Sequence, residues 1–149
     1  MKGYPRWFTP CLLWALAALL LTGLLLVPTM LEMRLDWDPG WRLGGAARLA
    51  TASLHAALAF GCTLFLGALW SVHMRAGWGR RRHRTTGLTL ALLALALIVT
   101  ALGVYYLADE TLASGIALLH TVLGLVACAC LALHWAQARH PHGQRRRAT

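Results

Sequence analysis

The sequence predicts an all-α integral membrane protein, a four-helix up-down-up-down bundle. Two observations predict it. Four apolar stretches, each about 20 residues or longer, occupy most of the 149 residues, and 58% of all residues are hydrophobic. The connections between them are short, which favours antiparallel neighbours. Only helices and closed barrels satisfy the backbone in lipid, so the stretches are expected to be helices. No linker separates two units, so residues 1–149 form one predicted domain.

The first two predicted spans cover about residues 8–30 and 46–73. Thr9-Pro10 suits an N-cap followed by proline in the first turn. This first stretch is too long for a signal peptide and lacks a small-residue cleavage site. Asp38-Pro39-Gly40, between the two spans, indicates a turn.

The last two predicted spans cover about residues 87–108 and 112–136. Thr85 or Thr86 is expected to cap the third span, and Asp109 the fourth. Because the connection around Asp109 is very short, these two spans are expected to form a tight antiparallel pair.

The basic residues predict the topology. Eleven of the fourteen fall on one side of the predicted membrane: Lys2, Arg6, Arg75, Arg80, Arg81, Arg82, Arg84, Arg139, Arg145, Arg146 and Arg147. The other side holds Arg34, Arg42 and Arg48 with all five acids, Glu32, Asp36, Asp38, Asp109 and Glu110. Since positive charge is retained in the cytoplasm, we predict a bacterial inner-membrane protein with both termini cytoplasmic. The basic runs are expected to contact anionic lipid headgroups and not nucleic acid.

Cysteine usage favours no disulfide framework. Cys11, Cys62, Cys128 and Cys130 all lie within predicted spans, where they are expected to behave as small hydrophobic residues.

Four histidines in the predicted spans are the candidate functional residues. His55 and His73 lie eighteen residues apart in the second span, and His120 and His134 lie fourteen apart in the fourth. At about 100° per residue, each pair returns to one helix face, within about 40°. Spans two and four run in the same direction, so His55 is expected opposite His120 near the outer face, and His73 opposite His134 near the inner face. His83, His140 and His142 lie among arginines and are expected to be solvated.

An imidazole inside hydrocarbon normally faces a partner or a cofactor, and neutral imidazole is a normal axial ligand of haem iron. The residues between the histidines on these faces leave room for flat macrocycles: Ala59, Cys62, Leu66 and Leu69 on one span, and Gly124, Ala127 and Leu131 on the other. We therefore predict two b-type haems, an outer one on His55 and His120 and an inner one on His73 and His134.

This plan resembles the cytochrome b of quinol:cytochrome c oxidoreductases, in which two helices each carry two haem ligands. At four spans, the chain is closer in size to the compact dihaem b-type cytochrome subunits that anchor periplasmic dehydrogenases and hydrogenases. The spacing of His120 and His134 matches the cytochrome b pattern, while that of His55 and His73 is one turn longer. The hydrogenase-type subunits take one ligand from the first helix, where this chain has no histidine. Matching the two spacings by helix tilt alone needs close to 40°, the limit of what is seen.

Several further residues are candidates for contacts to the haems or to a quinone. Arg48 and Arg42 are expected near the propionates of the outer haem, and Arg75 or Arg80 near those of the inner haem, with topology and lipid contact as the alternative for each. For the aromatic and acidic residues at the membrane boundaries, interfacial anchoring is favoured over a quinone site: Trp70, Trp78, Trp135, Tyr105, Tyr106, Asp109 and Glu110.

The predicted function is transmembrane electron transfer between the quinone pool and a partner redox protein. The chain carries no soluble redox domain, no dinucleotide fingerprint and no C-x-x-C-H motif, so we expect an electron-transfer subunit with its partner on the outer, periplasmic face rather than an enzyme on its own. Two alternatives remain open. One is a scaffolding subunit of a respiratory or photosynthetic complex, without haem. The other is a metal-ion transporter, which would favour carboxylates within the spans.

Overall fold

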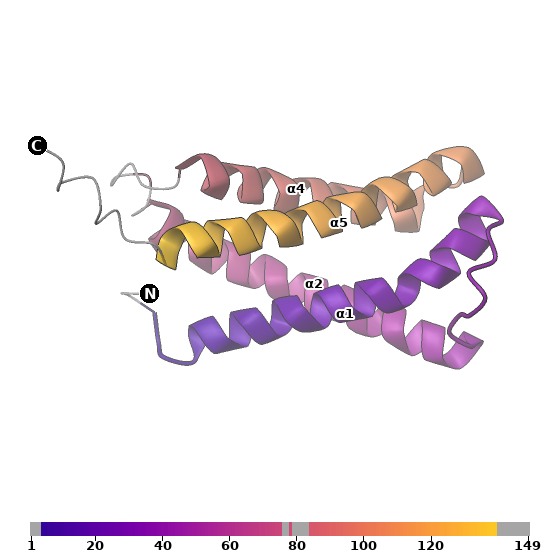
Figure 1. The fold of residues 1–149 in the computed structure, drawn as a ribbon, viewed down its shortest axis with the longest axis horizontal. Coiled ribbons are helices and arrows are strands. Elements are labelled where there is room, and N and C mark those ends of the chain that lie inside the picture. The colour runs from indigo at the N-terminus through magenta and orange to yellow at the C-terminus, as the bar shows by residue number, and fades with distance from the viewer. Residues whose placement is uncertain (1–3, 76–77, 79–83, 140–149) are drawn as a thin grey trace, which may run out of the picture.

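The computed structural model describes residues 4–75, 78 and 84–139 (Figure 1). Within these residues the chain forms α1 (Phe8–Leu35), α2 (Gly45–Leu69), a π-helical turn η1 (Trp70–Met74) that continues α2, α4 (Arg84–Tyr106) and α5 (Glu110–Arg139). Four helices are long and apolar enough to cross a membrane. The all-α, up-down-up-down membrane bundle expected from the sequence is confirmed.

The helices form two antiparallel hairpins. α1 packs against α2, α4 packs against α5, and α1 also contacts α5. Figure 1 shows that α1 begins and α5 ends at the same end of the bundle, which we call the terminal end. Residues 36–44 and 107–109 connect the helices at the opposite end, which we call the loop end.

Two of the expected helix caps are wrong. α1 begins at Phe8, so Thr9 lies inside it, and Trp7 at the cap position makes no side-chain cap bond. α4 begins at Arg84, which places Thr85 and Thr86 inside the helix. For Thr86 the reason is a tertiary partner, since its hydroxyl lies 2.8 Å from His134 Nδ1, which local sequence cannot show.

The turn and the cap expected at the loop end are confirmed. Asp38 Oδ1 accepts a hydrogen bond from the Gly40 amide at 2.8 Å, and Gly40 has a φ of 76°, a conformation that favours glycine. Asp109 Oδ1 accepts a hydrogen bond from the Leu112 amide at 2.8 Å and so caps α5.

α4 and α5 approach each other closely at Gly103. A Cβ atom added there would lie 2.8 Å from Ile116 Cγ2, so a larger residue would require the Ile116 side chain or the helices to shift.

α2 contributes no buried side chain to the bundle. No residue of α2 is buried, and no large side chain of the described residues is fully buried. Among the described elements, α2 packs closely against α1 but not against α4 or α5, and α1 also contacts α5.

Candidate cofactor site: two histidine pairs

The structure brings the four intramembrane histidines together as two pairs. At the loop end, the ring centres of His55 on α2 and His120 on α5 lie 6.5 Å apart. At the terminal end, the ring centres of His73 on η1 and His134 on α5 lie 6.3 Å apart. The rings within each pair are nearly perpendicular, at 78° and 79°. These are the partners that helical periodicity predicts.

The ring separations suit a metal ion between two imidazoles. Each metal–nitrogen bond is about 2.0–2.1 Å and each nitrogen lies about 1 Å from its ring centre, so two imidazoles on one metal have centres roughly 6 to 6.5 Å apart. A direct hydrogen bond between two ring nitrogens, about 3 Å long, would bring the centres to roughly 5 Å. The observed 6.5 Å and 6.3 Å match the first arrangement.

Threonine hydroxyls contact the Nδ1 atoms of three of these rings. His55 Nδ1 lies 3.0 Å from Thr22 Oγ1 on α1, and His120 Nδ1 lies 2.8 Å from Thr100 Oγ1 on α4. At the terminal end, His134 Nδ1 lies 2.8 Å from Thr86 Oγ1 on α4. Each contact joins the two helices of one hairpin. Because each contact uses Nδ1, the other ring nitrogen, Nε2, remains available to bind a metal ion.

The threonines at the loop end also define the tautomer of the rings. The hydroxyl of Thr22 donates to the Ala18 carbonyl at 2.8 Å, and that of Thr100 donates to the Ala96 carbonyl at 2.8 Å. With its single proton used, each hydroxyl oxygen accepts from the Nδ1–H of the facing histidine. Nε2 then carries the free lone pair that a metal needs, which is the usual arrangement of a metal-bound histidine.

The contacts of these hydroxyl groups with the histidines were not predicted, although the spacing of the residues contains a signal. Thr86 and Thr100 lie fourteen residues apart, as do His120 and His134. Tyr4, whose hydroxyl accepts a hydrogen bond from the His73 amide at 3.2 Å, lies eighteen residues before Thr22, the spacing of His55 and His73. When two helices pack antiparallel, residues that lie opposite one another are separated by the same number of residues on both helices. A matching interval between polar residues on neighbouring spans would have identified them.

The long interval between His55 and His73 includes η1. In a π-turn the hydrogen bonds run from residue i to i+5, so each turn takes more residues than an α-turn. His73 lies within this turn, which accommodates part of the difference between the eighteen-residue and fourteen-residue histidine intervals. Helix tilt and leaning haem planes are the explanations that the sequence offers for this interval, because a π-turn has no local signature.

The faces between the histidines are as expected from their periodicity. Ala59, Cys62, Leu66 and Leu69 on α2, with Gly124, Ala127 and Leu131 on α5, are all half-buried. Phe60 and Leu64, on the other side of α2, are 77% and 78% exposed, as suits side chains that face lipid. The four cysteines are free thiols.

Gly23 lies directly against the His55 ring, and replacing it with alanine is expected to disturb the loop-end pair. A Cβ atom there would lie 3.1 Å from His55 Cε1, and the ring cannot easily withdraw because its Nδ1 is bonded to the adjacent Thr22. We expect Gly23→Ala to weaken cofactor retention at the loop end, measured as bound cofactor per chain. Gly61→Ala, at a site with nothing within 4 Å, is the matched control. Equal retention in both variants would contradict the prediction.

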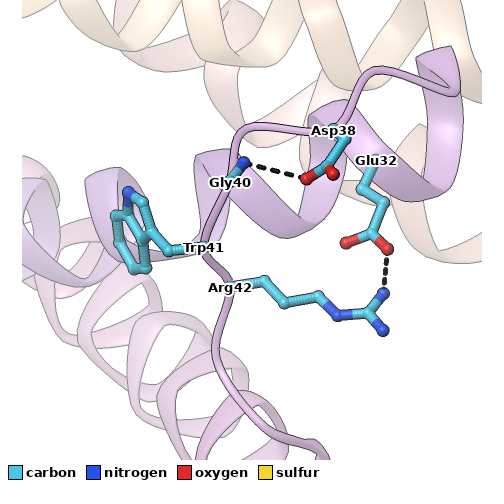
Figure 2. A pocket seen from close by; sticks show the side chains of 5 residues that line it. All are labelled: Glu32, Asp38, Gly40, Trp41 and Arg42. Atoms are coloured by element: carbon cyan, nitrogen blue, oxygen red, sulfur yellow. Dashed lines mark hydrogen bonds and ion pairs between the residues drawn. The ribbon is translucent and has the colours of Figure 1, made fainter.

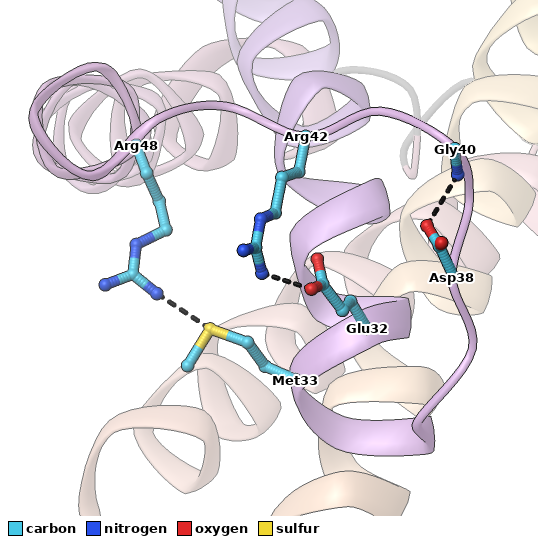
Figure 3. A network of polar contacts seen from close by, with 6 residues as sticks. All are labelled: Glu32, Met33, Asp38, Gly40, Arg42 and Arg48. Atoms are coloured by element: carbon cyan, nitrogen blue, oxygen red, sulfur yellow. Dashed lines mark hydrogen bonds and ion pairs between the residues drawn. The ribbon is translucent and has the colours of Figure 1, made fainter.

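The arginines at the loop end differ in their partners. Arg42 forms an ion pair with Glu32 beside the Asp38–Gly40 turn, and with Trp41 these residues line an open pocket of about 260 Å³ (Figure 2). Arg48, seven residues before His55, donates instead to Met33 Sδ at 2.7 Å (Figure 3). Among the described residues, no carboxylate pairs with Arg48. Arg48 is thus the better placed of the two for an anionic group of a ligand.

The remaining candidates show no assembled site. Arg75 is exposed, two residues after His73, and Arg80 and the three predicted surface histidines lie outside the described residues. Tyr105 and Tyr106 are 65% and 81% exposed at the end of α4. Trp70, Trp78 and Trp135 are also exposed, as membrane-interface residues are.

Comparison with known proteins adds no assignment, because no family model, curated protein or solved structure matches the chain.

Within the described residues, no three His, Cys, Asp or Glu side chains converge on one point. A bare zinc ion would ordinarily require such a set, since it takes three or four protein ligands. The geometry of the two histidine pairs is therefore the feature that any function must explain.

Proposed function

We propose that this protein is a transmembrane dihaem b-type cytochrome that carries electrons between the quinone pool and a partner redox protein. The observation that carries the proposal is the pair of facing imidazoles at each end of the bundle, with ring centres 6.5 Å and 6.3 Å apart. Two protein ligands are enough for haem iron, because the porphyrin supplies the other four nitrogens. When bound, the haem supplies an iron that accepts and releases one electron.

The chain's own residues fit such a group in two ways. The Nδ1 contacts of Thr22, Thr100 and Thr86 hold three of the rings and leave Nε2 for the iron. The residues between the histidines are mostly small or aliphatic, as a flat macrocycle requires.

The positions of the pairs along the helices suit electron transfer across a bilayer. At about 1.5 Å per residue, the fourteen residues from His120 to His134 span about 21 Å of a hydrocarbon core about 30 Å thick. One haem would therefore lie near each membrane face. A haem held by both imidazoles of a pair would have no open position for a substrate, which favours electron transfer over catalysis at the iron.

The charge distribution supports an orientation for this cytochrome. Eleven of the fourteen basic residues lie in the sequence before α1, between η1 and the first turn of α4, or from Arg139 onward. The terminal end is therefore assigned to the cytoplasm and the loop end to the periplasm of a bacterial inner membrane. Arg48 is assigned to a propionate of the loop-end haem and Arg75 to one of the terminal-end haem. A partner redox subunit is proposed to dock at the loop end.

The test is an optical spectrum of the protein purified in detergent. We expect reduced-minus-oxidised bands of low-spin b-type haem and two haems per chain, measured against protein concentration. Colourless pure protein would overturn the proposal in favour of a scaffolding subunit.

A further inference from the structure

The Tyr4 hydroxyl contacts the backbone at the one place where the second transmembrane helix departs from α-helical geometry. It donates a hydrogen bond to the Ala68 carbonyl at 3.0 Å and accepts one from the His73 amide at 3.2 Å. Ala68 and His73 are five residues apart, the separation that a π-turn hydrogen bond spans. One phenol group therefore bridges the Ala68 carbonyl, in the last turn of α2, and the His73 amide in η1.

The ring of Tyr4 is fixed by aromatic contacts. It stacks on Phe8 with ring centres 4.2 Å apart and planes at 20°. Phe8 is 5% exposed and makes an edge-on contact with Phe65 of α2, with ring centres 5.3 Å apart. The phenol is thus held between the start of α1 and the end of α2, which positions its hydroxyl at the turn.

The π-turn determines where His73 points. A continuous α-helix would pair the Ala68 carbonyl with residue 72, one residue earlier than the π pairing. Reverting to α-helical geometry would rotate His73 about the helix axis and move it along that axis. π-turns occur rarely, and mostly at functional sites, because they are less stable than α-turns without a compensating interaction.

We propose that Tyr4 is a positioning residue for the terminal-end haem: its hydroxyl bridge stabilises the η1 turn and so holds His73 opposite His134. Among the described residues, the His73 ring has no threonine partner, unlike the other three rings. Its position is determined through its backbone instead. This inference rests on the proposed ligation of haem by His73.

The experiment compares wild-type protein with Tyr4→Phe, which removes the hydroxyl oxygen and keeps the stacked ring. The readout is carbon monoxide binding by the reduced protein, because an iron with two axial histidines has no open position and an iron that has lost one does. Wild type is expected to bind none. Tyr4→Phe is expected to bind carbon monoxide at one of its two haems, with added imidazole restoring the low-spin spectrum, or to lose the terminal-end haem while keeping the other.

Two control variants separate the bridge from general effects on the fold. Ser71→Ala removes a second hydroxyl that donates to the Ala68 carbonyl, at 2.8 Å, and leaves the Tyr4 bridge intact. Tyr106→Phe removes an exposed phenol at the loop end. Both are expected to behave like wild type.

The inference is overturned if Tyr4→Phe keeps two haems that do not bind carbon monoxide, or if it loses both haems together. In the His73→Ala background, Tyr4→Phe should cause no further change, since the ligand that it positions is already absent. A wild-type protein without haem would instead refute the proposed function, so the two failures are distinguishable.

Discussion

Replacing His120 with alanine is expected to lower the haem content from two per chain to one. The ring of His120 faces His55 at the loop end, so on the proposed ligation its loss would leave the loop-end haem with one histidine ligand. His134 lies fourteen residues further along α5 and pairs with His73 on η1, so the terminal-end haem is expected to remain. Haem stoichiometry and the reduced spectrum of the remaining haem measure the effect.

The reciprocal variant makes this experiment specific. His134→Ala should remove the other haem and leave a spectrum that complements that of His120→Ala. His140→Ala, at a histidine predicted to be solvated, is the control for general effects of losing an imidazole. If His120→Ala retains two haems, or if both variants leave the same spectrum, the pairing of histidines as axial ligands is refuted.

Replacing Thr100 with valine is expected to weaken haem binding at the loop end by about 10-fold to 100-fold, the usual effect of losing a partner behind a metal-bound histidine. Thr100 is 6% exposed, so its removal leaves the Nδ1–H of His120 without an acceptor in an apolar surrounding. Such an unsatisfied group costs about 1 to 3 kcal/mol. We also expect a raised midpoint potential for this haem, because an imidazole that no longer donates a hydrogen bond is a weaker base.

Two control variants test this prediction, one at Thr100 itself and one at another threonine of α4. Thr100→Ser keeps the hydroxyl and should restore both affinity and potential. Thr89→Val removes a hydroxyl that donates only to the Thr85 carbonyl, at 3.0 Å, and should have no effect on either haem. A valine variant whose haem affinity and potential equal those of wild type would show that the Thr100 contact is incidental.

The fold was largely predictable because the bilayer imposes strict requirements on a sequence. Helix length, apolar composition and short connections leave a four-helix bundle as the expected structure, and the observed spans fall close to the predicted ranges. The caps were harder to predict. Asp109 was identified correctly from local sequence, whereas Thr86 was assigned to a cap and in fact contacts His134.

The candidate site was predictable only in part. The two histidine pairs follow from helical periodicity and from the parallel direction of α2 and α5. The residues behind the histidines were missed, because a threonine in an apolar helix usually bonds to a carbonyl one turn earlier. Thr51 and Thr63 do this, and no local feature distinguishes them from Thr22.

Sequence alone determined the membrane class, the four spans, the clustering of positive charge at one end and the choice of four histidines, because hydrophobic length, charge and the 3.6-residue period are properties of the chain itself. Tertiary structure decided which threonine hydroxyl contacts three of the four rings, the π-turn at His73 and the contacts of Tyr4 with the Ala68 carbonyl and the His73 amide. These depend on contacts between residues far apart in sequence, and they exist only when the helices pack in one register.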